Sequence, residues 1–193
     1  MEHVVKIDSL PCYDLLQEYN NLYEKGIVEH PLGIEKTYQI CLNTTPDYPD
    51  DMFFGTGNLF KNWDKGYYNE QGKFVVNDQS SDIKETDFTM LCTQFRGTLF
   101  EDVYNKLNAQ YNVGRIRLMT NWPRTCLSWH HDFGTHRIHY PIKTQLGCIM
   151  VFEEKNYVLN ENTWYYTYTD QMHTAINASK DYRTHLVATI LPK

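Results

Sequence analysis

The segment WHHDF at residues 129–133 places two histidines and an aspartate in consecutive positions. Adjacent imidazoles repel one another when both are protonated and lose hydration when both are buried, so neither an ordinary core nor an ordinary surface favours this arrangement. A bound metal ion does favour it. Alternate side chains of an extended strand share a face, so His130 and Asp132 are expected to point into one space. His131 points away and is interpreted as a strand residue that packs against the opposite layer.

A third metal ligand has to come from another strand, and His173, at the end of the segment TYTDQMH, is the natural candidate. Two histidines and one carboxylate on one face of an octahedral ion leave the other positions open, which suits non-heme Fe(II) oxygenases. A turn and a following strand would carry Arg183 back into the same cavity, where its planar guanidinium suits a carboxylate bound through two hydrogen bonds. These residues together predict a pocket for a small anion that chelates iron.

Strands must position these residues. Short runs rich in β-branched and aromatic residues follow Gly114, at 115–120, 136–142, 148–152, 163–169 and 183–191. No helical period lies between them, which excludes an alternating βα architecture and favours a sandwich or barrel of antiparallel strands.

The part before Gly114 has a different pattern. It predicts a helix that is capped by Ser9 and ends at Gly26, a strand over 38–42, and a helix capped by Thr98. The polar stretch 43–72 reads as a long loop. Loops of this length often form lids or binding walls, so it is either part of a substrate pocket or an irregular surface connection.

Length and composition limit the remaining classes. A chain of 193 residues fits a single domain, with helices, a long loop and supporting strands in 1–112 and the sheet core that carries the metal site in 113–193. The net charge of -6 argues against a nucleic-acid partner. No apolar run is long enough to cross a membrane and the N-terminus lacks a signal-peptide pattern, so we expect a soluble cytoplasmic protein without a membrane partner. The five cysteines form no CxxC pair, so no thiolate zinc site is indicated.

Four motifs in order give the chain a family resemblance. From about Arg115 to Leu191 it resembles the aspartyl/asparaginyl β-hydroxylase-like branch of the Fe(II)/2-oxoglutarate-dependent dioxygenases, which includes bacterial free-proline hydroxylases. The motifs are WHHDF with its H-x-D, RIHYPIKT with its R-x-H-x-P, Trp164, and HTAINASKDYRTHLV with its H-x9-R. The resemblance implies a mainly β fold, a double-stranded β-helix (jelly roll, cupin-like) with flanking N-terminal helices. It also implies that 2-oxoglutarate and O2 are converted to succinate and CO2 while an unactivated C–H bond is hydroxylated.

The resemblance also implies roles for particular residues. The metal ligands would be His130, Asp132 and His173, and the cosubstrate would be held by Arg183 at its distal carboxylate and by Arg137 and His139 near its iron-chelating end, with Ser128 approaching the pocket. Some members of this branch have glycine in place of the acidic ligand, whereas this chain has Asp132. The substrate of the founding enzymes therefore does not transfer directly.

Three functions stay open at this point. The first is a 2-oxoglutarate-dependent hydroxylase acting on a small molecule, a free amino acid or an amino-acid side chain. The second is a cupin-like metalloenzyme, a zinc or manganese isomerase or hydrolase, and the third is a non-catalytic jelly-roll binding module. Only the first requires an arginine to clamp a cosubstrate carboxylate, so Arg183 discriminates in its favour. Arg115 and Arg117 share a strand face and would suit an anionic substrate, although a solvated or ion-paired face is the preferred interpretation.

Overall fold

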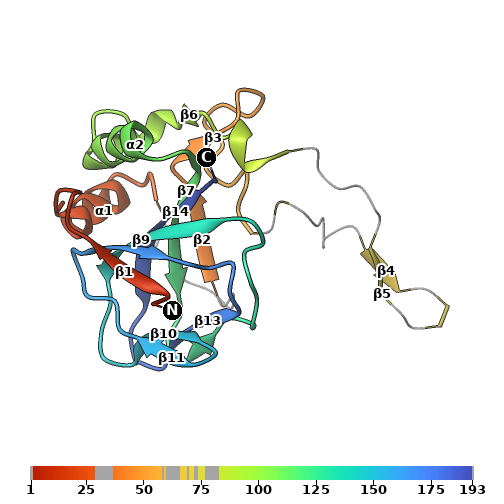
Figure 1. Cartoon of the computed structure of the whole chain (residues 1–193). Helices are drawn as coiled ribbons and strands as arrows, with labels where there is room; N and C mark the ends of the chain where they lie inside the picture. Colours follow the sequence, from red (N-terminus) through yellow and green to blue (C-terminus); the bar gives the residue numbers. More distant parts are fainter. Residues whose placement is uncertain are drawn as a thin grey trace.

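The computed structural model describes residues 2–28, 37–57, 59, 66–68, 70–71, 74–76 and 83–192. Two antiparallel sheets face one another in a jelly roll, and the two α-helices cover the outer side of the larger sheet (Figure 1). The double-stranded β-helix with N-terminal helices that the sequence implies is confirmed. Parts of the polar stretch 43–72 lie outside the described residues.

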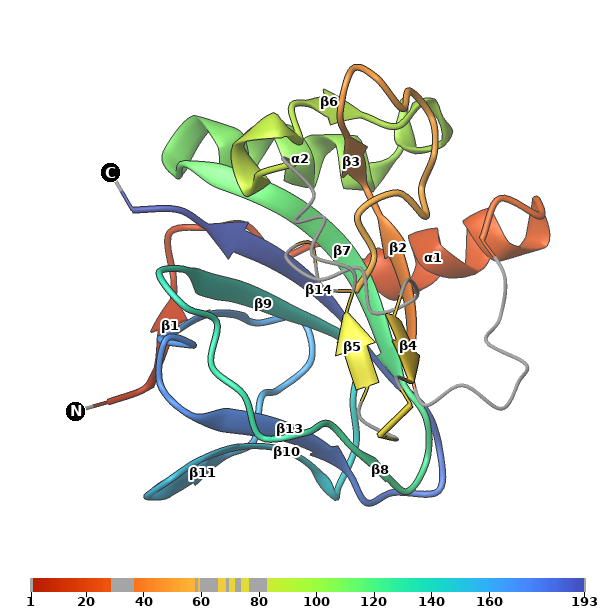
Figure 2. The same ribbon diagram turned by 90° about the vertical axis from the view of Figure 1, so that its right-hand side faces the viewer.

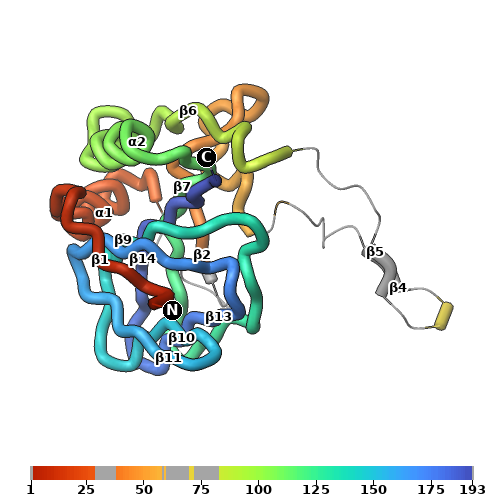
Figure 3. The backbone as a smooth tube through the Cα atoms, in the orientation of Figure 1, coloured from red at the N-terminus to blue at the C-terminus, as the bar shows by residue number. Residues whose placement is uncertain are grey.

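The larger sheet has six strands, which lie in the order β1 (Val4–Ile7), β12 (Trp164–Thr167), β9 (His136–Lys143), β14 (Arg183–Ile190), β7 (Val113–Asn121) and β2 (Thr37–Cys41). The facing sheet has four strands, in the order β11 (Lys155–Tyr157), β10 (Cys148–Phe152), β13 (His173–Asn177) and β8 (Thr125–Cys126). Figure 2 shows β9, β14 and β7 on one side of the space between the sheets, and β13 and β10 on the other. The tube in Figure 3 shows the last strand, β14, returning to the middle of the molecule, where it pairs with both β7 and β9.

The outer face of the larger sheet is apolar because alternate residues of its central strands are aliphatic or aromatic. It forms one core with the helices α1 (Leu15–Glu24) and α2 (Leu99–Gln110), and the buried strand residues of this core are Ile116, Leu118, Ile138, Tyr140, Ile142, Leu186, Ala188 and Ile190. Leu15, Tyr19 and Leu22 of α1 and Phe100, Val103 and Leu107 of α2 face them. The main hydrophobic core therefore lies between the sheet and the helices.

The inner face of the same strands is polar. Pairing of Val187 with both Arg117 and His139 sets these three side chains in one row across β7, β14 and β9. Residues two or four positions away along the strands share their face, and these are Arg115, Met119, Arg137, Pro141, Arg183, His185 and Thr189. Arginines and histidines thus line the space between the sheets, where a sandwich ordinarily has apolar residues. This space is where a polar ligand would bind.

The first helix begins later than the sequence predicts. Its N-cap is Asp14, whose side chain accepts a hydrogen bond from the backbone N–H of Gln17 at 3.1 Å, and not Ser9. The segment between them contacts the sheet instead, since Tyr140 Oη accepts from the backbone N–H of Tyr13 at 2.9 Å and Trp164 Nε1 donates to the carbonyl of Pro11 at 2.8 Å. Tertiary contacts therefore outweigh the local capping signal of Ser9. The second helix is capped by Thr98, as expected.

The smaller elements complete the body. β3 (Asn43–Thr44) pairs with β6 (Met90–Leu91), β4 (Gly66–Tyr68) pairs with β5 (Phe74–Val76), and two 3-10 turns cover Glu85–Asp87 (η2) and Thr93–Phe95 (η3). Asn43 joins β3 to β7, because its amide donates to the carbonyl of Gly114 at 2.9 Å and its Oδ1 accepts from the N–H of Ile116 at 2.7 Å. None of the helices in the described part of the chain is long and apolar enough to cross a membrane.

Candidate metal centre and cavity

The structure brings His130, Asp132 and His173 together. One ligand atom from each lies within 4.8 Å of the other two. His130 and His173 form an isolated antiparallel bridge, with N–H to carbonyl distances of 3.1 and 2.8 Å. The sequence predicts an extended strand through Asp132, but the structure has no strand at this residue. The position of Asp132 is fixed by its own backbone N–H, which donates to the carbonyl of Thr169 at 2.7 Å. It therefore joins the two histidines through a turn and not through strand alternation.

The hydrogen bonds of the two imidazoles suit a metal ion. Nδ1 of His130 lies 2.7 Å from the carbonyl oxygen of Ser128, and Nδ1 of His173 lies 2.8 Å from that of Gln171. A carbonyl only accepts, so each Nδ1 carries the proton and each Nε2 presents a lone pair. Bonds of this kind fix the ring orientation of metal-ligating histidines. Burial lowers the pKa of His173, which keeps the ring in the neutral form that a metal requires.

The two carboxylate oxygens of Asp132 face different partners. Its Oδ1 forms an ion pair of 3.0 Å with Nη2 of Arg137, while its Oδ2 lies 4.0 Å from Nε2 of His173. Arg137 thus orients the carboxylate, and Oδ2 remains directed toward the histidines. Two neutral nitrogens and one oriented carboxylate oxygen form the donor set of a facial triad. These residues fit a divalent transition-metal ion such as Fe(II).

A cavity of about 690 Å³ extends from this cluster between the two sheets. Its size is within the range of small-molecule sites. All seven residues that the sequence singles out for the site line it, namely Ser128, His130, Asp132, Arg137, His139, His173 and Arg183. Gly57 also lines it, so the polar stretch 43–72 contributes to the cavity wall.

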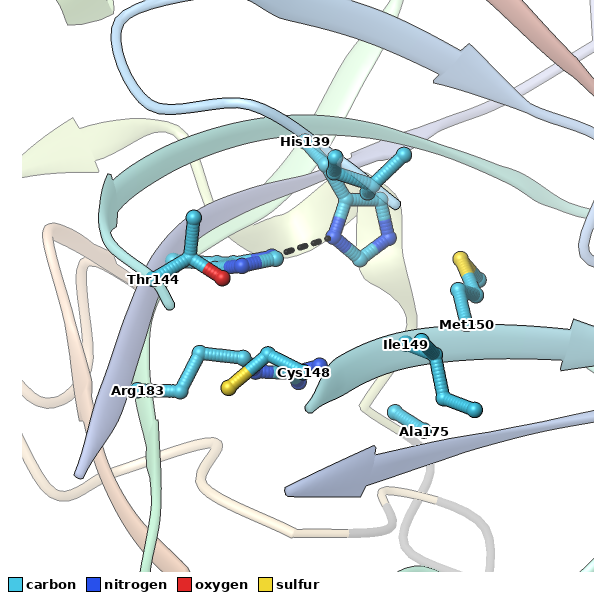
Figure 4. A pocket seen from close by; sticks show the side chains of 9 residues that line it. His139, Thr144, Cys148, Ile149, Met150, Ala175 and Arg183 are labelled. Atoms are coloured by element: carbon cyan, nitrogen blue, oxygen red, sulfur yellow. Dashed lines mark hydrogen bonds between the residues drawn. The ribbon is translucent and has the colours of Figure 1, made fainter. Parts of the chain in front are cut away.

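Arg183 lies between the sheets, and only 6% of its surface is exposed. Its Nε is buried and has no hydrogen-bond partner, and no carboxylate of the described residues pairs with it. Arg183 also lines a second, smaller cavity of about 10 Å³, together with Cys148 and Ala175. Figure 4 shows the side chains around this cavity. Burial lowers the pKa of Arg183 to about 10, and the negative charge of an anion bound there would act against this shift.

Two further histidines lie beside Arg183. Nδ1 of His139 and Nδ1 of His185 are 3.4 Å apart, the contact drawn as a dashed line in Figure 4, and the Nε2 atoms of both rings are buried without a partner. Burial, and then the charge of Arg183, lower the pKa of both rings well below 6.5. Both are therefore neutral at physiological pH, and because one Nδ1 must donate to the other, only the accepting ring has a proton on Nε2 that it can donate to an anion. His185 lines the smaller cavity beside Arg183, a position that its strand face alone leaves undecided.

His131 and Ser128 differ from the sequence interpretation in detail. His131 does not pack against an opposite layer; it is exposed at the mouth of the cavity, with its ring edge-on to Phe133 at 5.9 Å. The extended pairing stops at His130 and a turn follows at residues 133–134, so strand alternation does not determine the direction of this side chain. Ser128 contributes its backbone carbonyl, which holds His130.

The two arginines of β7 separate into a paired and an unpaired one. Arg115 forms a buried ion pair of 2.8 Å with Glu85, as the preferred sequence interpretation has it. Arg117 is not solvated, since only 5% of its surface is exposed, and no described carboxylate pairs with it. Strand alternation in the sequence correctly places Arg117 on the inner face. Nothing in the sequence shows that Glu85, which lies in a 3-10 turn, pairs with Arg115 and not with Arg117.

Comparisons with known proteins address the fold and the family of this chain. The viral collagen prolyl hydroxylase from Paramecium Bursaria Chlorella virus-1, solved with 2-oxoglutarate, is similar in structure over 98% of this chain and 96% of its own, with a TM-score of 0.50 and 12% identity. A predicted oxalate decarboxylase from Thermotoga maritima matches over 48% of this chain and 73% of its own, with a TM-score of 0.35 and 19% identity. No curated protein sequence matches significantly. A sequence model of the family described as aspartyl/asparaginyl beta-hydroxylase matches residues 60–192, farther toward the N-terminus than the motifs and over more than half of the chain. The chain therefore belongs to the aspartyl/asparaginyl β-hydroxylase family.

Proposed function

We propose that this protein is an Fe(II)- and 2-oxoglutarate-dependent oxygenase that hydroxylates an unactivated C–H bond of a free amino acid or an amino-acid side chain. Membership in a hydroxylase family supports the reaction class. The single observation that carries the cofactor assignment is the position of Arg183, buried without a carboxylate partner in the cavity that begins at His130, Asp132 and His173. A cupin-like isomerase or a binding module has no cosubstrate carboxylate that would require this clamp.

His130, Asp132 and His173 would hold the iron, which with 2-oxoglutarate and O2 supplies the oxidising chemistry and releases succinate and CO2. The protein holds each ligand in place through a specific partner. The carbonyls of Ser128 and Gln171 keep the imidazoles in one tautomer, and Arg137 holds Oδ1 of Asp132. These contacts set the ligand geometry before the metal binds, which is the preorganisation that a reactive metal site needs.

Arg183 would bind the distal carboxylate of 2-oxoglutarate through its unsatisfied N–H groups. An uncompensated buried guanidinium is costly, and a carboxylate at this point offsets that cost by charge and by hydrogen bonds. His139 and Arg137 lie on the path from Arg183 to the metal and would position the cosubstrate near its chelating end. Neutral His139 can donate a hydrogen bond without adding charge.

Cosubstrate binding is the most direct test. Anaerobic titration of Fe(II) and 2-oxoglutarate into the protein is expected to produce the weak visible charge-transfer band of the iron chelate. Arg183→Ala should weaken 2-oxoglutarate binding by roughly 30-fold or more, because removing one partner of a buried charge pair costs about 2–5 kcal/mol. Arg96→Ala, which removes an exposed arginine elsewhere on the surface, is the matched control and should leave the titration unchanged.

Two results would refute the assignment. One is a protein that binds Fe(II) through the triad but gives no chelate band with 2-oxoglutarate. The other is an Arg183→Ala variant that binds 2-oxoglutarate as tightly as the unmodified protein. If neither result is found, a screen of free amino acids for succinate release would identify the substrate.

A further inference from the structure

The inner face of the larger sheet presents a second buried cation that cosubstrate binding does not use. Arg117 lines the same cavity as Arg183 but stands on β7, on the far side of β14 from His139. Strands in a sheet are about 4.8 Å apart, so the backbones of Arg117 and His139 are separated by roughly 10 Å. This separation leaves room for a second small molecule beside one that contacts His139.

The guanidinium of Arg117 is only partly satisfied. Nη1 donates to Oε1 of Gln39 at 3.2 Å and, over a longer 3.4 Å, to the carbonyl of Gly57, while the buried Nε has no partner. Both partners are neutral. By contrast Arg115 is paired with Glu85 and Arg137 with Asp132. Burial and the neighbouring Arg115 and Arg137 lower the pKa of Arg117 to about 9, which reflects the absence of a compensating anion.

The charges of the cavity wall indicate what is missing. Four arginines and two carboxylates line it among the described residues, so with neutral histidines the wall carries two net positive charges. The iron and 2-oxoglutarate of the proposed function bring charges that cancel. A site that holds both iron and 2-oxoglutarate would therefore keep an excess of positive charge. Arg117 is the arginine of this wall that pairs with no described carboxylate and has no assigned contact with the cosubstrate.

We propose that Arg117 is the specificity-determining residue of the substrate site and binds a carboxylate of a small substrate, through the planar guanidinium that Gln39 orients. This inference rests on the proposed function and names its substrate class: a free amino acid or another small carboxylic acid, and not a neutral peptide segment. A carboxylate at Arg117 can accept two parallel hydrogen bonds from N–H groups on one edge of the guanidinium. It would fix the far end of the substrate and leave the rest of the molecule extending along the cavity toward the metal ligands.

Binding can be measured without turnover. Protein loaded anaerobically with Mn(II) and 2-oxoglutarate is titrated in a calorimeter with the free L-amino acids, with a series of aliphatic mono- and dicarboxylic acids, and with the carboxamide of each. At least one acid is expected to bind, and its carboxamide should bind roughly 30-fold or more weakly, because the amide leaves the buried guanidinium without its anion. Arg117→Met should remove this preference for acid over amide.

Two variants separate recognition from folding. Arg117→Lys keeps the charge but loses the planar fork, so it should retain part of the preference. Arg96→Met removes an exposed arginine and should behave as the unmodified protein. All variants should still bind 2-oxoglutarate, which shows that they are folded and that the cosubstrate half of the site is intact.

The outcomes distinguish the two proposals. If the unmodified protein does not bind 2-oxoglutarate, the proposed function is wrong. If 2-oxoglutarate binds, the Arg117 inference is overturned by an acid-to-amide preference that Arg117→Met leaves unchanged, or by the failure of every acid in the series to bind. A purely structural Arg117 would lower the melting temperature in Arg117→Met and leave the preference as it was.

Discussion

The buried ion pair between Glu85 and Arg115 forms one end of the cavity wall and allows a quantitative prediction. Oε1 of Glu85 accepts hydrogen bonds from Nε and Nη2 of Arg115 at 3.0 and 2.8 Å, and Oε2 accepts from the backbone N–H of Arg115 at 2.9 Å. Exposed fractions are 5% for Glu85 and 3% for Arg115. The substitution Glu85→Gln keeps the shape of the side chain and removes its charge.

Removing one member of a buried ion pair leaves the other charge without compensation, at a cost of about 3–5 kcal/mol. The amide oxygen introduced by the substitution could still accept from Arg115, but every remaining partner of the guanidinium, including the carbonyls of Gly55 and Gly57 at Nη1, would be neutral. For a chain of this length, each kcal/mol lowers the melting temperature by about 2–4 °C, so Glu85→Gln should lower it by roughly 6–20 °C. The double variant Glu85→Met/Arg115→Met should lose less, because it removes both charges from the interior.

Urea unfolding followed by circular dichroism, at pH 7.5 and again at acidic pH, measures these differences. Burial raises the pKa of Glu85, but the hydrogen bonds and charge of Arg115 outweigh it and lower the pKa below 4.5. The stabilisation is thus present above about pH 4.5 and is lost as the pH falls further, so the gap between the two proteins should narrow in acid. A loss below 1 kcal/mol for Glu85→Gln at pH 7.5, or a double variant less stable than the single one, would refute the reasoning.

Three other predictions concern separate parts of the structure. Gly114→Ala should destabilise the protein by about 1–3 kcal/mol in urea unfolding, since an added Cβ would lie 2.7 Å from Oε2 of Glu85; a neutral effect would show that Glu85 moves aside freely. Asp132→Ala should weaken Mn(II) binding in equilibrium dialysis by roughly tenfold or more, whereas the exposed His131→Ala should not; equal losses would remove Asp132 from the ligand set. His185 is buried in its neutral form, so the unfolded chain takes up a proton near pH 6.5 that the folded chain does not, and stability falls as the pH falls through this value. Relative to His185→Phe, the unmodified protein should lose stability on the order of 1 kcal/mol between pH 7.5 and 5.5, and parallel pH profiles would contradict the assignment.

The sequence identifies the parts of this fold that follow from strand periodicity. Alternation in 115–120, 136–142 and 183–191 correctly predicts three strands of the larger sheet and places Arg117, His139 and Arg183 on one face. Residues 148–152 form β10 with the predicted bounds. These elements are predictable because each carries its own pattern of buried and polar positions.

Other features depend on partners far away in the chain. The short strand β1 is held by pairing with β12, for example Val4 with Thr167, and its four residues carry too little pattern to reveal it. Asp132 reaches the metal cluster through a backbone hydrogen bond to Thr169, not through the strand alternation of its own segment. The tertiary structure likewise determines that Glu85 pairs with Arg115 and not with Arg117. Each of these contacts is non-local, so a local pattern does not encode it.

The location of the hydrophobic core explains why this sheet can hold so many cations on one side. In an ordinary sandwich the apolar core fills the space between the sheets. Here Leu118, Leu186 and Tyr140 face the helices instead, and α1 and α2 provide the apolar partner that a second sheet would otherwise supply. The inner positions are thereby released from core packing and can carry Arg117 and Arg183. The candidate metal ligands from the facing sheet and its adjoining turn lie across the cavity from this cationic face, an arrangement that fits the proposed binding of anions next to a metal.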